Sequence, residues 1–187
     1  MLISLALAAV VAGAPPLASS PCPSAALFQG VRAHTGGARW DTVKELIADG
    51  TVTAVGLTGR TRIATDLVSG ATSTADESSI ATQRIVSSRA ATWKQDLTLG
   101  VHRLDAPDAR AAARTSAYLA RNGYFNPSAD PATFTCLSDV REDGRTLRRM
   151  RIVPRDGRAV SVWVDPAAHV IVRTQQQAPT SLSTVHY

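Results

Sequence analysis

Few side chains in this sequence have the types and spacings that carry catalysis. Four acids of the middle third are candidates for the carboxylate pair of glycoside chemistry: Asp66, Asp76, Glu77 and Asp96. Acids scattered in this way usually form turns or lie in solvent. The sequence has no G-x-S-x-G nucleophile elbow, and the GLTG segment at 56–59 lacks the Lys-Ser/Thr of a phosphate-binding loop. We therefore expect no enzymatic activity from this chain.

The two cysteines, Cys22 and Cys136, can form a disulfide in an oxidising compartment. They lie 114 positions apart, and closing so long a loop is worth about 4 kcal/mol in the chain-entropy model. Lipidation of Cys22 is the alternative, but Pro21 stands where a lipidation motif needs a small residue. The cysteines and the four scattered histidines, among them His34 and His102, have no metal-ligand spacing. The sequence predicts neither a metal site nor a cofactor.

Positive charge is supplied almost entirely by arginine. The net charge is +5, with 18 arginines and 2 lysines. Such an excess can indicate an anionic partner, such as nucleic acid or a lipid head group, or it can reflect arginines on solvated strand faces. No run of five like charges occurs and no aromatic residues interleave with arginine, so we predict no nucleic-acid binding. With 44% hydrophobic but 5% aromatic residues among 187, we expect one domain with a core of Val, Leu, Ile and Ala.

The N-terminus has the features of an export signal. Residues 2–14 form an uncharged apolar run of 13, which is too short to span a bilayer comfortably and is followed by two prolines. We predict a signal peptide over residues 1–20, with its cleavage site open, and a single domain over residues 21–187. The mature protein would be periplasmic or secreted, without a stable membrane span. A short buried helix at residues 2–14 is the alternative.

Two helices are expected in the domain. Residues 24–34 predict a short helix with Ser24 as its N-cap. Residues 105–122 predict the clearest helix, with Asp105 as its N-cap. One face of this helix carries arginines, and the other carries alanines and Leu119. A face of small residues either packs closely against a sheet or leaves room for something else.

The remaining segments alternate as strands do. Residues 47–105 predict several short strands, with turns at Thr58-Gly59 and Ser69-Gly70. After residue 132, Asp-Gly and Asp-Pro turns separate alternating runs and predict an antiparallel meander. The first of these runs is residues 133–141. The last, residues 180–187, reaches the end of the sequence and predicts an edge strand or a truncated product.

Six segments occur in an order that is typical of one protein family. They are GG-x-x-W (36–40), DGTVTAVGLTG (49–59), DLVSG (66–70), W-x-x-D (93–96), a tyrosine-bearing helix (108–123) and R-x-x-P-R-D-G-R (151–158). Over residues 24–187 the chain resembles the N-terminal region of secreted bacterial proteins that often carry a retroviral-type aspartyl protease domain. That region is similar in fold to the periplasmic lipoprotein carriers. The resemblance implies a mainly β, α+β fold, in which a curved antiparallel sheet forms an open half-barrel with one or two helices on its concave side.

The chain departs from the family pattern in two places. Family members tend to have an Asp-Gly turn shortly before W-x-x-D, whereas residues 88–91 read SRAA here. An aspartyl protease also needs an Asp-Thr-Gly or Asp-Ser-Gly loop, because two carboxylates must share one proton to activate water. Neither tripeptide occurs in the sequence. The resemblance therefore implies no protease activity for this chain.

The resemblance and the alternating strands lead to a binding hypothesis. A curved sheet closed by a small-faced helix would leave a concave apolar space for an acyl chain, a lipoprotein or an apolar peptide. The apolar candidates for its lining are Val52, Val55, Leu57, Leu119, Phe134, Met150, Ile152, Val160, Val162 and Val164. The same residues could equally make a filled core. Two other possibilities stay open: an accessory domain that packs against a protease domain or an envelope protein and binds no small ligand, or an enzyme shortened by truncation.

Overall fold

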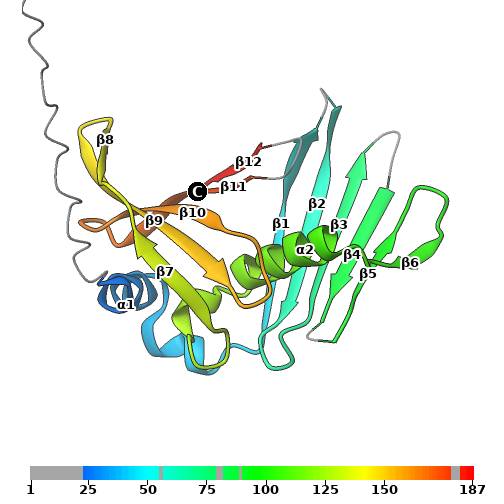
Figure 1. The fold of residues 1–187 in the computed structure, drawn as a ribbon, viewed down its shortest axis with the longest axis horizontal. Coiled ribbons are helices and arrows are strands. Elements are labelled where there is room, and N and C mark those ends of the chain that lie inside the picture. Colours follow the sequence, from blue (N-terminus) through cyan, green and yellow to red (C-terminus); the bar gives the residue numbers. More distant parts are fainter. Residues whose placement is uncertain (1–22, 55–56, 79–81, 89, 178–181) are drawn as a thin grey trace, which may run out of the picture.

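The computed structural model describes residues 23–54, 57–78, 82–88, 90–177 and 182–187. The predicted α+β class, with mainly β structure, is confirmed. The strands form two antiparallel sheets that do not close into a barrel, rather than one continuous sheet (Figure 1). The predicted signal peptide at residues 1–20 lies outside the described residues.

The first sheet, called the N-terminal sheet below, is a meander whose six strands follow the order of the sequence. Its strands are β1 (Glu45–Ala54), β2 (Leu57–Asp66), β3 (Thr72–Ser78), β4 (Thr82–Ser87), β5 (Thr92–Gln95) and β6 (Val101–Arg103). The predicted turn at Ser69-Gly70 is confirmed: Gly70 has a φ of 74°, and its N–H donates to the carbonyl of Asp66 at 2.9 Å. Gly70 thus takes a conformation that most residues avoid.

The predicted turn at Thr58-Gly59 is wrong, because both residues lie inside β2 and pair with Thr53 and Val52 of β1. Gly59 is needed for the packing of β2 against β3 rather than for a turn. A Cβ atom on Gly59 would lie 2.2 Å from the carbonyl oxygen of Glu77 on β3. Glycine therefore permits the close approach of two strands at this position.

The second sheet, called the C-terminal sheet below, has the strand order β12-β11-β10-β9-β7, with β8 also paired to β9. Its strands are β7 (Ala132–Cys136), β8 (Val140–Glu142), β9 (Arg145–Pro154), β10 (Val160–Asp165), β11 (Val170–Gln177) and β12 (Leu182–His186). The strand predicted over residues 133–141 is thus divided into β7 and β8, both of which pair with β9. Asp143 and Asp156 adopt positive φ values of 50° and 57° in the predicted Asp-Gly turns.

Helix α1 (Ser24–Thr35) leads into a short 3-10 helix, η1 (Gly37–Asp41), and helix α2 (Pro107–Ala120) leads into another, η2 (Gly123–Phe125). Neither predicted N-cap is correct. The capping positions are Pro23 and Ala106, without a side-chain hydrogen bond. Asp105 instead forms an ion pair with Arg103 at 3.1 Å, and a proline opens α2 because its missing N–H would have no partner in the first turn.

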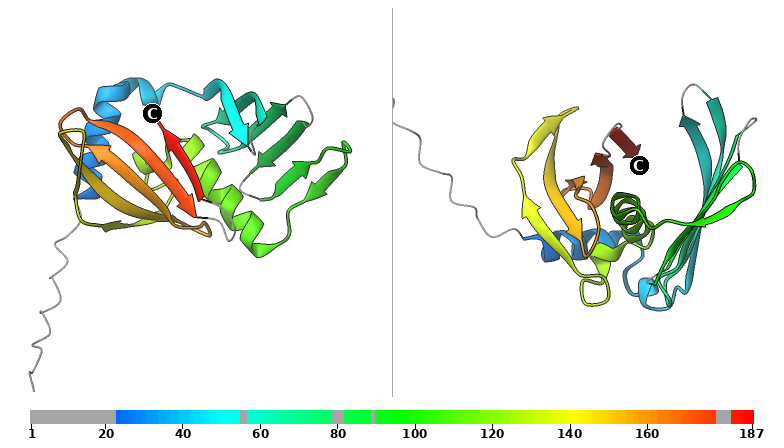
Figure 2. Two further views of the ribbon diagram at one scale, coloured as in Figure 1. Left: turned by 90° about the horizontal axis from the view of Figure 1, so that it is seen from above. Right: turned by 45° about the vertical axis from the view of Figure 1, so that its right-hand side comes forward.

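The hydrophobic core lies on one face of the C-terminal sheet, where α1 and η2 cover it. Phe28 of α1 stacks on Tyr124 of η2 with ring centroids 4.7 Å apart. Helix α2 lies between the two sheets (Figure 2). One side of α2 thus faces this core through Tyr118, which is buried, and the other side faces the N-terminal sheet.

Candidate ligand-binding site

A large cavity lies between the N-terminal sheet, α2 and the strands β11 and β12. Its volume is about 870 Å³, which falls within the range of about 300–1,000 Å³ that is typical of small-molecule sites. Its lining is mostly apolar, with a minority of polar groups. Three parts of the fold form its walls: the N-terminal sheet, α2 and the C-terminal sheet.

The floor of the cavity is the inner face of the N-terminal sheet. A row of directly paired residues crosses five strands and lines the cavity: Ala48, Ile63, Thr74, Ile85 and Lys94. Residues directly opposite one another in antiparallel strands project to the same face. The pairing register of the sheet therefore fixes which side chains meet the cavity.

The second wall is the small-residue face of α2. Ala109, Ala112, Ala113, Ser116 and Ala120 recur at helical spacing and line the cavity. Of the two possibilities that the sequence left open for this face, the structure shows the second: the alanines leave room between α2 and the sheet. Leu119 also lines the cavity.

The third wall comes from the far sheet, through Thr174 and Gln176 of β11 and through Val185 and Tyr187 at the end of the chain. Charged residues are scarce in the lining, which includes Lys94 and Asp76. Asp76 accepts a hydrogen bond from the amide of Gln83 at 3.3 Å. The side chain of Lys94 has no ion-pair partner among the described residues.

Most of the residues that the sequence predicts as the lining of an apolar cavity lie outside this cavity. Five of them belong to the core of the C-terminal sheet, at most 1% exposed: Met150, Ile152, Val160, Val162 and Val164. Phe134 packs against the same core, and its ring lies 5.7 Å from that of Phe28. These residues fill a core instead of lining the cavity, because α1 and η2 cover their face of the sheet. The side chains of Val52 and Leu57, and the whole of Val55, lie outside what the structure describes.

Sequence reasoning missed the actual floor of the cavity. Its residues are threonines, single apolar residues such as Ile63 and Ile85, and a few polar side chains that include Lys94, on a sheet that is poor in large apolar groups. That shortage was itself a usable signal. Short side chains on the inner face of a sheet leave space unfilled when the alanine-rich helix opposite is held away from the sheet.

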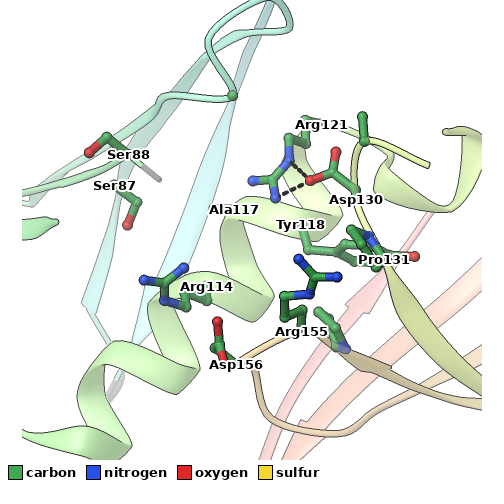
Figure 3. A pocket seen from close by; sticks show the side chains of 13 residues that line it. Ser87, Ser88, Arg114, Ala117, Tyr118, Arg121, Asp130, Pro131, Arg155 and Asp156 are labelled. Atoms are coloured by element: carbon green, nitrogen blue, oxygen red, sulfur yellow. Dashed lines mark hydrogen bonds and ion pairs between the residues drawn. The ribbon is translucent and has the colours of Figure 1, made fainter. Parts of the chain in front are cut away.

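A second, smaller pocket of about 210 Å³ lies beside α2 (Figure 3). Three arginines line it: Arg114 from α2, Arg121 directly after the end of α2, and Arg155 from the turn between β9 and β10. Two carboxylates, Asp130 and Asp156, also line it. Arg121 donates to Asp130 through Nε at 2.8 Å and Nη2 at 2.5 Å, so this pair is largely neutral within the pocket.

The two cavities adjoin. Ser87 of β4 and Ala117 of α2 line both of them. Tyr118 lines the smaller pocket only; burial, and to a lesser extent the Asp130 carboxylate, raises the pKa of its hydroxyl. Tyr118 therefore stays neutral and leaves the charge of the pocket to the arginines and acids.

Cys136, at the end of β7, is disulfide-bonded. Its predicted partner Cys22 lies outside the described residues, so that pairing stays a prediction. The described part of the chain contains no group of three or more His, Cys, Asp or Glu residues that could hold a metal ion. None of the described helices has both the length and the hydropathy needed to cross a membrane.

Of the comparisons with known proteins, the one with solved structures finds similar folds. No family model matches the sequence, and no curated protein matches it. Among solved structures, the chain is similar to a DUF1329 family protein from Desulfovibrio piger, with a TM-score of 0.45 and 13% sequence identity. The alignment covers 82% of this chain and 72% of that protein.

Proposed function

We propose that this protein is a non-catalytic binding module that holds an apolar ligand, such as an acyl chain, in the cavity between the N-terminal sheet and α2. The observation that carries the proposal is the unfilled space of about 870 Å³ beside the alanine face of α2. In the core on the C-terminal sheet, by contrast, apolar side chains fill the space completely: Met150 and Val162 are 0% exposed. Apolar side chains such as Ile63 and Ile85 border the cavity but leave its space unfilled.

The lining favours an apolar chain over a polar ligand. Ala112, Ile63 and Ile85 offer contact by burial, which contributes about 0.8 kcal/mol for each methylene removed from water. Most of the surface that the lining exposes is apolar, so affinity would rise with chain length rather than depend on one functional group. A disulfide at Cys136 supports action in an oxidising compartment, as expected for a periplasmic or secreted protein.

The test is a titration of the mature protein with a fluorescent fatty acid, together with native mass spectrometry of the gently purified protein. We expect saturable binding and co-purified lipid. Ala113→Phe would place a ring in the cavity and should weaken fatty-acid binding at least about ten-fold, because the ring takes space that the chain needs. Ala33→Phe is the matched control, since Ala33 is an exposed position on α1.

Two outcomes would reject the proposal. One is that the wild-type protein takes up no fatty acid and carries no lipid. The other is that Ala113→Phe and Ala33→Phe bind equally well although both variants are folded. Either result would favour the accessory-domain alternative, in which the module contacts a protease domain or an envelope protein and binds no small ligand.

A further inference from the structure

We propose that the arginine-lined pocket binds the anionic head group of the ligand whose apolar chain occupies the large cavity. This inference rests on the proposed function and narrows it: the ligand would be an anionic amphiphile, with a phosphate or a carboxylate at one end. The chemistry of the pocket and its position beside the cavity carry the argument.

The pocket has one positive charge in excess, because three arginines and two aspartates line it. Asp130 is already engaged by Arg121, and the side chains of this pair are only 18% and 14% exposed. Arg155 has no ion pair and no side-chain hydrogen bond within the described ranges. Its guanidinium is therefore available to an anion, and a guanidinium pairs with a phosphate or carboxylate through two parallel hydrogen bonds.

The backbone holds Arg155 in position over the pocket. Its N–H donates to the carbonyl of Pro131 at 2.9 Å, and the N–H of Gly157 donates to the carbonyl of Pro154 at 2.9 Å. Figure 3 shows the Arg155 side chain extending from this turn into the pocket. Arg114 extends from α2 toward Ser87 of the N-terminal sheet in the same view. Cationic groups thus reach the pocket from two separate elements.

The pocket and the cavity adjoin at two shared lining residues. Ser87 and Ala117, which line both spaces, carry some of the shortest side chains available. The smaller space has about a quarter of the volume of the larger, 210 Å³ against 870 Å³. A small charged group in the first and a long chain in the second would match these two sizes.

Lys94 is the competing site for a head group, because it lies in the large cavity itself. The two sites can be separated by experiment. Ligands with the same twelve-carbon chain and different ends, dodecyl phosphate and dodecanol, are titrated against the full mature protein by displacement of a fluorescent fatty acid. Three variants are compared with the wild type: Arg155→Gln, Lys94→Gln, and Arg151→Gln as the control. Arg151 is exposed on β9 and does not line the pocket, so the Arg151→Gln substitution removes one positive charge away from the pocket.

The wild type is expected to bind dodecyl phosphate at least about ten-fold more tightly than dodecanol, because hydrogen bonds to charged groups are strong. Arg155→Gln should lose most of this preference and keep its affinity for dodecanol, which also shows that the variant is folded. Arg151→Gln should keep the preference. Rising salt should reduce it.

Three results would overturn the inference. Equal binding of the two ligands by the wild type would reject the head-group site and leave the apolar cavity standing. Loss of the preference in Lys94→Gln but not in Arg155→Gln would move the head group into the large cavity. Binding of neither ligand would reject this inference together with the proposed function.

Discussion

The hydroxyl of Thr115 bonds to both backbone groups of Arg158. It accepts a hydrogen bond from the Arg158 N–H at 2.7 Å and donates to the Arg158 carbonyl oxygen at 2.9 Å. The two residues are 43 positions apart, and Thr115 is 0% exposed. This contact attaches α2 to the segment between β9 and β10, and so fixes α2 against the C-terminal sheet.

Replacing Thr115 by valine should destabilise the fold. Thr115→Val keeps the shape of the side chain but leaves the part-buried N–H and carbonyl of Arg158 without their partner, at a cost of about 1–3 kcal/mol. Thr115→Ser is the control, since it keeps the hydroxyl. Urea unfolding followed by circular dichroism measures both. Equal stability of Thr115→Val and the wild type would contradict the importance of this contact.

Two isoleucines should respond differently to the same truncation. Ile152 is 0% exposed in the core, so Ile152→Ala should cost about 2–5 kcal/mol. Ile85 lines the cavity and is half-buried, so Ile85→Ala should cost less than half as much, because there is no tightly packed shell to disrupt. Denaturation midpoints of the two variants give the comparison. A cost at Ile85 that equals the cost at Ile152 would mean that the cavity is packed in solution.

Two glycines of the N-terminal sheet should also differ. Gly59→Ala should cost about 1–3 kcal/mol, because its new methyl group would collide with the backbone of Glu77 and force β2 and β3 apart. Gly50→Ala should be tolerated or slightly stabilising, by up to about 1 kcal/mol, since the nearest atom to an added Cβ is 3.5 Å away on Thr61. Thermal unfolding of both variants tests this; a tolerated Gly59→Ala would contradict the close approach described here.

Asp96 should make the stability of the folded protein depend on pH in the acidic range. Hydrogen bonds from the Thr98 hydroxyl at 2.7 Å and the Thr98 N–H at 2.9 Å, and then from His102, lower the pKa of Asp96 from 3.8 to about 2. The folded state therefore favours the ionised carboxylate. That stabilisation is complete above the ordinary pKa and is lost as the pH falls through about 2.

Asp96→Asn should accordingly be less stable than the wild type at neutral pH, and the difference should shrink as the pH falls from about 4 to about 2. Asp66 and Asp165 also have lowered pKa values, because of hydrogen bonds from Ser69 and Ala168 respectively. Because of these two carboxylates, the stability of the Asp96→Asn variant will also fall in acid. The quantity to follow is therefore the difference in unfolding free energy between the variant and the wild type. A difference that stays constant over this range would show that Asp96 does not contribute through its charge.

Reduction should destabilise the protein. If Cys22 is the partner of Cys136, Cys22→Ser and Cys136→Ser should lower stability by the same amount, up to about 4 kcal/mol for so long a loop. Non-reducing peptide mapping identifies the bridge directly. A cross-linked dimer, or a loss of stability in only one of the two variants, would argue against an intramolecular bond between these cysteines.

The β-rich fold was largely predictable, because local chemistry determines it. Asp143 and Asp156 sit in turns that need positive φ, and the alternation of Met150 and Ile152 with arginines predicts one buried face of β9. Thr58-Gly59 misled the prediction because glycine there serves a tertiary contact with β3, and such contacts have no local signature.

The candidate site was harder to predict. The alternation of apolar and polar residues along a strand indicates which side chains face inward. It does not indicate whether another layer of the fold packs against those side chains, so core valines such as Val160 could not be distinguished from cavity residues. The smaller pocket combines Arg114 and Arg121, which helical spacing places on one face of the helix predicted over residues 105–122, with Arg155 from a distant turn. Only the packing of that turn against α2 reveals this combination.

The scarcity of lysine has a practical consequence. Lys44 and Lys94 are the only two lysines in the sequence; Lys44 is exposed, whereas Lys94 borders the large cavity. An amine-directed reagent would therefore modify Lys44 whether or not the cavity is occupied, whereas a molecule bound in the cavity would protect Lys94 from the reagent. The ratio of the two labelled peptides would report how much of the protein is occupied, in a crude extract and without knowledge of the occupant.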